Sequence, residues 1–462
     1  MTDDSSAADE PVQSPDLGTP QGGRSAKSYR WRDQIRDTVR ALGPEDTQPM
    51  PRIAREPPPT PPDLIELLRA LGVALLNSAD SAASTTETLQ DVAAAYDVDL
   101  QAMVMPTGIL FRIGLREVDL VSVPNRALRL DQIAGVNSLI VQLRRAAITP
   151  TEGLRRLDQL LAAKPRFGPW LGVLGQVVLS LGFGLLLNPD LLALPFYAAL
   201  GAFVGILRMV ADKWATLSVA LPVVASFLVT VIAVKFVAPF VHDDPIRLVA
   251  PALVTFLPGA TLTIATIELA SDQIVSGASR LVWGVSQLLL LAFGVFIGLS
   301  LVGTVDASGA TQVGSWAPWV GVFLVGIGYM LFSSAPAGSL LFLWIALFAS
   351  YAAQVFGAAL LDPSLSGFVG GLVIVPLTYW LARFRKSPPA AVMLLPGFWL
   401  LLPGALGFRG VSSLATGTIS GATELVVTGI SIFAVALGVL VGTSVTRDAS
   451  AVHRTWRIKF RQ

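Results

Sequence analysis

Three acidic residues of an otherwise apolar region have surroundings that suit ion handling. Glu268 and Asp272 follow a long apolar run, and Glu424 begins another one. Carboxylates in membrane-spanning segments are costly to bury and are usually functional, because they can hold an ammonium group or carry a proton. We therefore predict that Glu268, Asp272 and Glu424 take part in ion coupling. The alternative for Glu268 and Asp272, which lie four residues apart and are expected on one helix face, is a structural role at a helix end, with Arg280 as a partner.

Two Pro-Gly pairs interrupt apolar runs at matching places in the two halves of the apolar region. They are Pro258-Gly259 and Pro403-Gly404. Proline removes a backbone donor, and glycine lets another backbone or a ligand come close. In lipid the freed backbone groups need a partner, and paired breaks of this kind are typical of a transporter's binding site near the bilayer midplane. Both pairs are therefore predicted to bind substrate.

Polar residues next to the two breaks could bind the same substrate. Thr261 and Thr263 are expected on the first turn of the helix that restarts after Pro258, where backbone donors and the positive helix end favour a carboxylate. The alternative is that their hydroxyls bond to preceding carbonyls of the helix. Arg409 follows the second break and could hold a carboxylate through two parallel hydrogen bonds, or be a solvated loop residue.

Another charged pair, Arg208 and Asp212, has i,i+4 spacing at the expected inner end of a span. Oppositely charged side chains with this spacing are neighbours on one helix face. We expect a structural ion pair.

Composition identifies the setting of these residues as a membrane. Of 462 residues, 53% are hydrophobic and 14% are charged, against about 25% charged in globular domains. Cysteine is absent and there are two histidines, which excludes disulfides, thiolate catalysis and a His-rich metal cluster. No P-loop or nucleophile-elbow motif occurs. We therefore expect no enzyme activity, no metal, no cofactor and no nucleic-acid partner.

The uneven distribution of charge divides the chain into five parts. We expect a disordered Pro-rich tail, a small cytoplasmic α+β domain, two transmembrane halves and a basic cytoplasmic tail. Their bounds are 1–62, 63–168, 169–305, 306–445 and 446–462. In the α+β domain, Ser84-Thr85-Thr86-Glu87 and Thr149-Pro150 are predicted to open helices. Short strands are expected at 103–105, 108–113 and 118–121.

About ten apolar segments of membrane-spanning length follow, which predicts a polytopic α-helical membrane protein. They are 170–187, 191–210, 215–239, 248–270, 281–303, 316–333, 338–360, 367–382, 390–407 and 424–444. Lysine and arginine gather in the connections that would share a side with both termini, so both termini are predicted to be cytoplasmic. Ten spans divide into five plus five. An odd number per half inserts the second half upside down, which predicts an inverted repeat with the breaks in its fourth and ninth spans.

Two stretches, together with this layout, resemble the threonine/serine exporter family of bacterial inner membranes. One is Leu71-Gly72-Val73-Ala74-Leu75-Leu76-Asn77-Ser78-Ala79-Asp80-Ser81 with Ser84-Thr85-Thr86. The other runs from Pro258-Gly259-Ala260-Thr261-Leu262-Thr263 to Glu268-Leu269, with Gly277 and Arg280 after it. The resemblance covers roughly residues 63–445.

The resemblance implies a secondary transporter in the cell inner membrane that exports threonine and serine, with protons as the coupling ion in an antiport. Substrate would bind near the broken helices at the interface of the two halves. The alternatives are export of another small carboxylate, such as a dicarboxylate, and a non-transporting membrane scaffold. A homo-oligomer is an open possibility.

Overall fold

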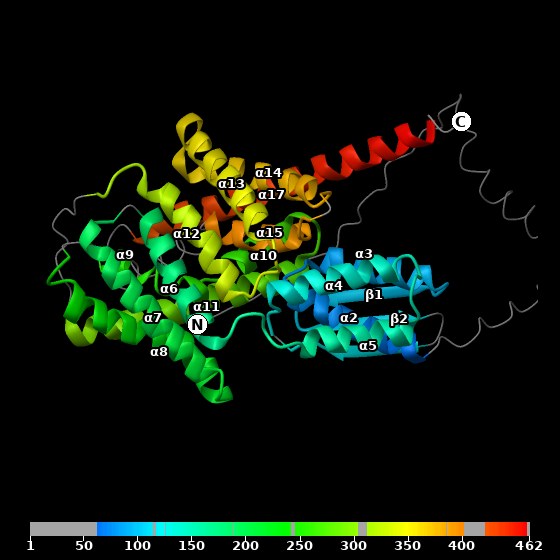
Figure 1. Cartoon of the computed structure of the whole chain (residues 1–462), viewed down its shortest axis with the longest axis horizontal. Helices are drawn as coiled ribbons and strands as arrows, with labels where there is room; N and C mark the ends of the chain where they lie inside the picture. The colour runs from blue at the N-terminus through cyan, green and yellow to red at the C-terminus, as the bar shows by residue number, and fades with distance from the viewer. Residues whose placement is uncertain are drawn as a thin grey trace, which may run out of the picture. The chain divides into compact units, whose positions relative to one another are not determined.

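The structure of the chain is a computed structural model, and it is mostly helical (Figure 1). It describes residues 62–113, 117–124, 126–187, 189–241, 245–303, 312–384, 386–401 and 421–459. Side chains are outside this description at 117, 215–219, 245–246, 421–425 and 447–459. Thr60–Gln462 form one compact unit. The expected tail of residues 1–62 lies, apart from its last residue, outside the described residues.

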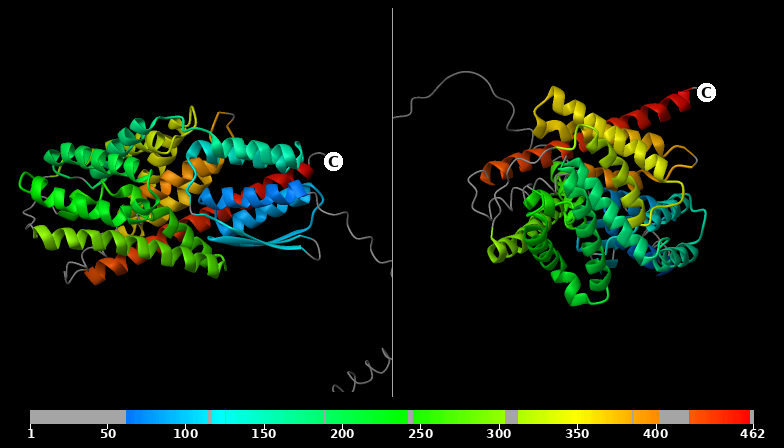
Figure 2. Two further views of the ribbon diagram at one scale, coloured as in Figure 1. Left: turned by 90° about the horizontal axis from the view of Figure 1, so that it is seen from below. Right: turned by 60° about the vertical axis from the view of Figure 1, so that its left-hand side comes forward.

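The first elements are four helices and a three-stranded antiparallel sheet of order β1-β2-β3. They are α2 (Pro62–Asn77), α3 (Ala82–Ala95), β1 (Leu100–Met105), β2 (Gly108–Ile113), β3 (Glu117–Ser122), α4 (Leu130–Leu143) and α5 (Pro150–Ala162). Figure 2 shows the sheet against one side of the helices. Strand β2 alternates, with Ile109 and Phe111 buried and Leu110 and Arg112 exposed. This alternation places one face of the sheet on a shared core with Leu71.

The helix caps of this part follow local sequence signals, with one difference from expectation. Thr149 caps α5 by accepting a hydrogen bond from the backbone N–H of Glu152, with Pro150 in the first helical position, which confirms that prediction. The cap of α3 is Ser81, whose Oγ accepts from the backbone N–H of Ser84 at 3.2 Å. The prediction that Ser84 opens this helix is therefore wrong, because Ser81 has the extended backbone that a cap requires and Ser84 already lies in the first turn.

Seven described helices are long and apolar enough to cross a membrane, which agrees with a polytopic helical membrane protein. They comprise α6 (Pro169–Leu186), η1 (Leu191–Ala193) with α7 (Leu194–Ala211), α8 (Ala215–Ile232) with η2 (Ala233–Val237), α11 (Ile274–Val302), α13 (Leu340–Leu360), η4 (Pro363–Leu365) with α14 (Ser366–Leu381), and α17 (Gly421–Lys459).

Three shorter apolar helices lie at the remaining expected spans. They are α10 (Gly259–Ala270), preceded by α9 (Pro245–Val249) and η3 (Val254–Phe256), then α12 (Ala317–Phe332) and α15 (Ala390–Leu400).

Helices α11 and α17 extend beyond the spans expected for them. Helix α11 has 29 residues and starts at Ile274, and α17 continues to Lys459. No proline or glycine follows Gly442, so nothing in the sequence ends α17 at the expected membrane boundary. The backbone of the predicted basic tail is therefore helical up to Lys459.

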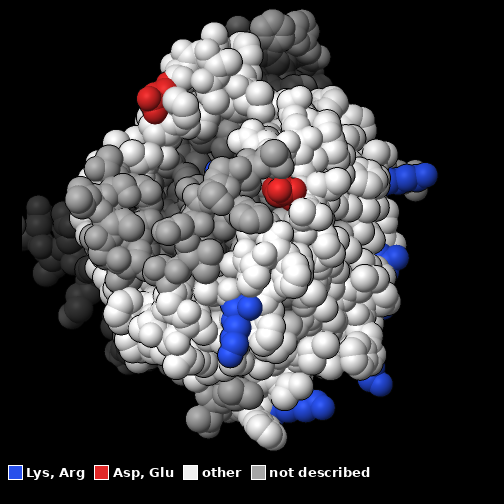
Figure 3. Space-filling view, turned by 90° about the vertical axis from the view of Figure 1, so that its left-hand side faces the viewer, with Lys and Arg blue, Asp and Glu red and all other residues white. Residues whose placement is uncertain are grey.

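The outward sides of the long helices are apolar. On α11, Val282, Phe293 and Leu301 expose 65%, 55% and 69% of their surfaces. Figure 3 shows one face of the molecule on which charged side chains are few and stand apart. The exposed apolar side chains suit a hydrocarbon environment rather than water.

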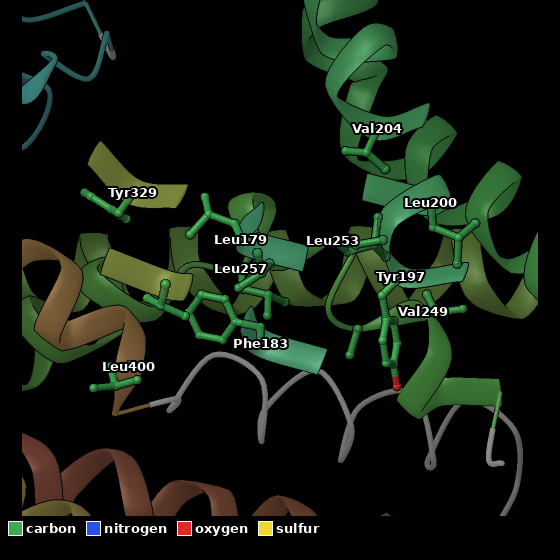
Figure 4. Packing of buried hydrophobic residues seen from close by; sticks show 14 of the residues in the cluster. Leu179, Phe183, Tyr197, Leu200, Val204, Val249, Leu253, Leu257, Tyr329 and Leu400 are labelled. Atoms are coloured by element: carbon green, nitrogen blue, oxygen red, sulfur yellow. The ribbon is translucent and has the colours of Figure 1, made fainter. Parts of the chain in front are cut away.

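The inner core joins the broken segment to its neighbours. Leu253 and Leu257, from the segment before α10, pack in one cluster with Leu179 and Phe183 of α6 and Leu200 of α7 (Figure 4). The segment therefore lies inside the helix bundle, and its irregular backbone is enclosed by protein.

Close glycine contacts join α6 to α12. A Cβ atom on Gly175 would lie 2.5 Å from the backbone N of Phe332 and 3.0 Å from the carbonyl O of Gly328. A Cβ on Gly182 would lie 3.0 Å from the carbonyl O of Gly321. Later residues of α6 meet earlier residues of α12, so the two helices run antiparallel. Small residues allow such close approach within membranes.

Pairs of glycines four residues apart also bring α11 close to α8 and α17 close to α14. Gly294 and Gly298 of α11 meet successive turns of α8, and Gly438 and Gly442 of α17 meet successive turns of α14. In both pairs later residues meet later residues. Helices α8 and α11 therefore run parallel, as do α14 and α17.

Candidate functional site

The polypeptide is irregular before Pro258 and becomes helical directly after it. Helix α10 begins at Gly259, and Pro258 occupies its N-cap position without a side-chain cap. The first hydrogen bond of the helix runs from the N–H of Leu262 to the carbonyl of Pro258, at 2.9 Å. The N–H groups of Gly259, Ala260 and Thr261 have no acceptor among the described residues. Free donors at a helix N-terminus favour an anionic group.

The two threonines after the break differ in what their hydroxyls do. Thr263 is fully buried, and its Oγ1 donates to the carbonyl of Gly259 at 3.0 Å. This bond is the structural alternative expected from the sequence. Thr261 is partly buried, and its hydroxyl has no partner within the described part of the chain. Of the two, Thr261 is the one whose hydroxyl is available to a ligand.

Glu268 lies at the opposite end of α10 and contacts the N-terminal elements. Its Oε1 accepts a hydrogen bond from the backbone N–H of Ala82 at 2.7 Å, and its Oε2 lies 3.1 Å from Nε of Arg280. The side chains of Glu268 and Arg280 are 1% and 11% exposed. Ala82 is the first residue of α3, so the carboxylate faces the positive end of that helix. Glu268 lies nine positions after Gly259 in the helix, which is about 14 Å.

Arg280 extends this contact to the loop before α3. Its Nη2 donates to the carbonyl of Asp80 at 3.0 Å. Burial raises the pKa of the Asp80 carboxyl to about 6, although nearby Arg280 and Arg144 act in the opposite direction. The part of the first family-like motif that ends in Asp80 and Ser81 therefore lies against the end of α10.

Asp272 does not share a helix face with Glu268, and that expectation is wrong. Helix α10 ends at Ala270, and Asp272 has a left-handed backbone with φ of 60° in the turn before α11. Its exposed side chain lines a groove of about 620 Å³ between α3, β1 and the start of α11. Thr86, Glu87 and Gln273 contribute the groove's other polar walls, together with Gln90 and Ser276. The role of Asp272 in ion coupling stays a prediction.

Arg208 is attracted electrostatically by Asp212, the partner expected for it, but its direct contacts are with other residues. No ion pair joins it to Asp212 among the described residues; Asp212 is the C-cap of α7 and lies just beyond the helix. The Arg208 guanidinium lies over two aromatic rings, at 5.5 Å from Phe256 and 5.0 Å from Phe332. Such stacking stabilises a cation in an apolar setting. Phe256 is two residues before Pro258, so Arg208 belongs to the surroundings of the break.

The structure does not describe the side chains of four predicted site residues. Pro403, Gly404 and Arg409 lie outside the described residues. Glu424 belongs to the first turn of α17, but its side chain is also outside the description. Among the residues searched, no group of three or more His, Cys, Asp and Glu could hold a metal ion.

The fold and this interior break define a polytopic helical membrane protein. A family model described as "Putative threonine/serine exporter" matches residues 66–302, just over half of the chain. The chain belongs to this family. The match runs from α2 to the end of α11 and so includes the break, Glu268 and Arg280.

Relatives of this chain occur in bacteria and fungi. A protein of Mycobacterium tuberculosis named "Probable threonine/serine exporter" is 23% identical over 412 residues, which cover 82% of this chain and 75% of that protein. Pheromone-regulated membrane protein 10 of Debaryomyces hansenii is 30% identical over 167 residues, or 34% of this chain. The matched region spans 16% of that fungal protein and 18% of its counterpart in Candida albicans. No solved structure matches the chain.

Proposed function

We propose that the protein is a secondary transporter that exports threonine and serine across the cytoplasmic membrane in exchange for protons. The observation that carries this proposal is the match to the exporter family over residues 66–302. A broken helix enclosed in the bundle supports it, because transporters commonly bind substrate at such breaks. In this proposal both termini and the α+β domain of residues 63–168 are cytoplasmic.

The membrane part is proposed to be an inverted repeat of residues 169–305 and 306–445. The first helices of the two halves, α6 and α12, meet through reciprocal glycine contacts and run antiparallel. Inside each half, the third and fifth helices run parallel and meet through glycines four residues apart. A two-fold axis in the membrane plane would produce both arrangements.

The substrate carboxylate is proposed to bind near the N-terminus of α10. The free N–H groups of Gly259 to Thr261 and the Thr261 hydroxyl support this location. Pro403, Gly404 and Arg409 would complete the site from the second half.

Glu268 is proposed to carry the coupling proton, with Asp272 and Glu424 on the proton or ammonium path. Among the side chains the structure describes, Glu268 is the one acidic residue that is almost fully shielded from solvent, with 1% exposed. Protonation would neutralise its charge opposite Arg280 and weaken the contact with α3. Proton binding would then change how the N-terminal elements hold α10.

Counterflow in proteoliposomes tests this function. Vesicles loaded with unlabelled threonine should accumulate labelled threonine, and serine should compete while succinate should not. A proton gradient should drive net threonine movement. Protein-free vesicles and Pro258→Ala, which allows a continuous helix, should show background uptake.

Two results would replace the proposal. Succinate exchange without threonine exchange would show a dicarboxylate exporter. Background uptake of every substrate by the wild-type protein would favour a non-transporting scaffold.

A further inference from the structure

Three buried polar atoms without hydrogen-bond partners belong to residues around the break. They are Oε1 of Gln176 on α6, Nη1 of Arg208 on α7 and Oγ1 of Thr255 in η3, and none has a partner among the described residues. Gln176 is itself fully buried. Each buried polar group left unpaired costs about 1–3 kcal/mol, so such groups are uncommon unless they serve a function.

The three side chains are held against one short stretch of backbone. Nε2 of Gln176 donates to the carbonyl of Ala252 at 3.0 Å, and the Arg208 guanidinium lies 5.5 Å from the ring of Phe256. Thr255 lies between Ala252 and Phe256 in the chain. Helices α6 and α7 also touch here, because a Cβ on Gly205, one turn before Arg208, would lie 3.3 Å from Cβ of Gln176.

The unpaired atoms have complementary hydrogen-bonding roles. Arg208 offers a charged donor, Thr255 a hydroxyl that donates or accepts, and Gln176 an acceptor. The orientation of the Gln176 amide follows from its bond to a carbonyl, which requires the NH₂ group on that side. A ligand that satisfies all three carries an acceptor group, for which a carboxylate is suited, and, beside it, a donor such as an ammonium group.

We propose that Gln176, Arg208 and Thr255 bind the zwitterionic head group of the exported amino acid, an assignment that rests on the function proposed above. In this proposal Arg208 and Thr255 bind one oxygen of the carboxylate, and the free N–H groups at the start of α10 bind the other. Gln176 accepts from the α-ammonium group. An ionised dicarboxylate has no donor for Gln176 and places a second negative charge beside a buried acceptor. The site therefore selects amino acids over dicarboxylates.

The position of the site links it to the break. Phe256 stacks on Arg208 and stands two residues before Pro258. A carboxylate that draws the guanidinium toward itself also shifts its contact with this ring. Head-group binding thereby acts on the segment that leads into α10.

The test compares three ligands that differ in one group each. L-threonine has both groups, threoninol lacks the carboxylate, and 3-hydroxybutyrate lacks the α-ammonium group. Binding to the purified full-length protein is measured by calorimetry, and competition is measured in the threonine counterflow assay. Wild-type protein should bind threonine about 10–100-fold more tightly than either analogue, because a hydrogen bond to a charged group contributes about 1.5–3 kcal/mol.

Variants should change discrimination in a residue-specific way. Arg208→Gln should bring the affinities for threonine and threoninol within about threefold of each other, and Arg208→Lys should restore part of the difference. Gln176→Leu should bring the affinities for threonine and 3-hydroxybutyrate within about threefold of each other. It should leave the preference for threonine over threoninol unchanged. If these residues had only a structural role, the variants would be less stable but would keep the relative affinities for the three ligands. Thr255→Val, which is close in size, provides a variant that should fold and still weaken threonine binding.

The outcomes separate this site from the function itself. Wild-type protein that neither binds nor transports threonine would overturn the proposed function and the site with it. The site alone would be overturned if wild-type protein transports threonine, folded Arg208→Gln and Gln176→Leu variants keep wild-type discrimination, and Thr255→Val keeps wild-type affinity for threonine.

Discussion

Replacing Glu268 and Arg280 by glutamine, singly and together, measures what their buried contact does. The carboxylate oxygen lies 3.1 Å from Arg280 Nε, and the two side chains are 1% and 11% exposed. Each single replacement leaves one buried charge without its partner. Both replacements together leave two neutral amides of similar size.

The expected energies follow from this burial. Breaking a buried ion pair by removing one partner costs about 3–5 kcal/mol, because the remaining charge stays desolvated. Glu268→Gln should lie at the lower end, since the amide oxygen can still accept the hydrogen bond of Ala82. The double variant should lose less than the sum of the two single losses by about 2 kcal/mol.

The free energy of unfolding is measured by titration with SDS in mixed micelles. A matched cycle on Glu152 and Arg155, an exposed pair with side chains 29% and 57% exposed, serves as the control. Solvent screens such pairs, so its coupling should be the smaller of the two. A coupling of zero between Glu268 and Arg280 would refute the reasoning about their contact.

Transport by the same variants separates stability from proton coupling. If Glu268 carries the proton, threonine efflux should be independent of the pH gradient in Glu268→Gln and also in the double variant. If Glu268 only pairs with Arg280, the double variant should regain both stability and pH-driven efflux. The second result would remove Glu268 from the coupling mechanism.

Three further predictions use matched variants. Thr261→Val should weaken threonine binding about fivefold or more in calorimetry, whereas Thr263→Val should change it little because that hydroxyl is already bonded to the helix; equal effects would contradict this. Gly175→Ala should lower the free energy of unfolding by about 1–3 kcal/mol. Gly172→Ala in the same helix, with open space at its Cβ, should raise it by about 0.5–1 kcal/mol; stabilisation by both would refute the close contact. Asp80 has a folded pKa of about 6, above its ordinary value of 3.8, so its stabilising contribution is complete below pH 4 and is lost as the pH rises through 6. Asp80→Asn should therefore unfold less readily than wild type by on the order of 2 kcal/mol at pH 7 and show no such advantage at pH 4.

Local features of this chain could be predicted from sequence because their causes are local. The helix restarts at Gly259 because Pro258 cannot continue a preceding helix, and the Thr149 cap follows from residues within one turn. The sequence also allows the pairing of Glu268 with Arg280 as the structural alternative to ion coupling, since both residues lie near one connection between helices. Each of these features depends on neighbours in the chain.

Contacts between distant segments could not be predicted in this way. The hydrogen bond from Ala82 to Glu268 joins residues 186 positions apart, and no periodicity announces it. Arg208 has a carboxylate four residues away in the sequence but stacks on Phe256 and Phe332, which only the packing of α7 against its neighbours brings close. Spacing along one helix therefore indicated Asp212, which attracts the guanidinium electrostatically, but not the two rings that contact it.

The two ends of α10 have different chemistry, and the helix connects them rigidly. Neutral backbone donors are free at Gly259, while a charged pair holds Glu268 against the first turn of α3. Twelve residues of helix extend about 18 Å, too far for one small ligand to touch both ends. A substrate bound at the break and a proton bound at Glu268 can therefore influence each other only by moving α10 or its contacts. Because the same carboxylate contacts α3, such a movement would also reach the N-terminal elements.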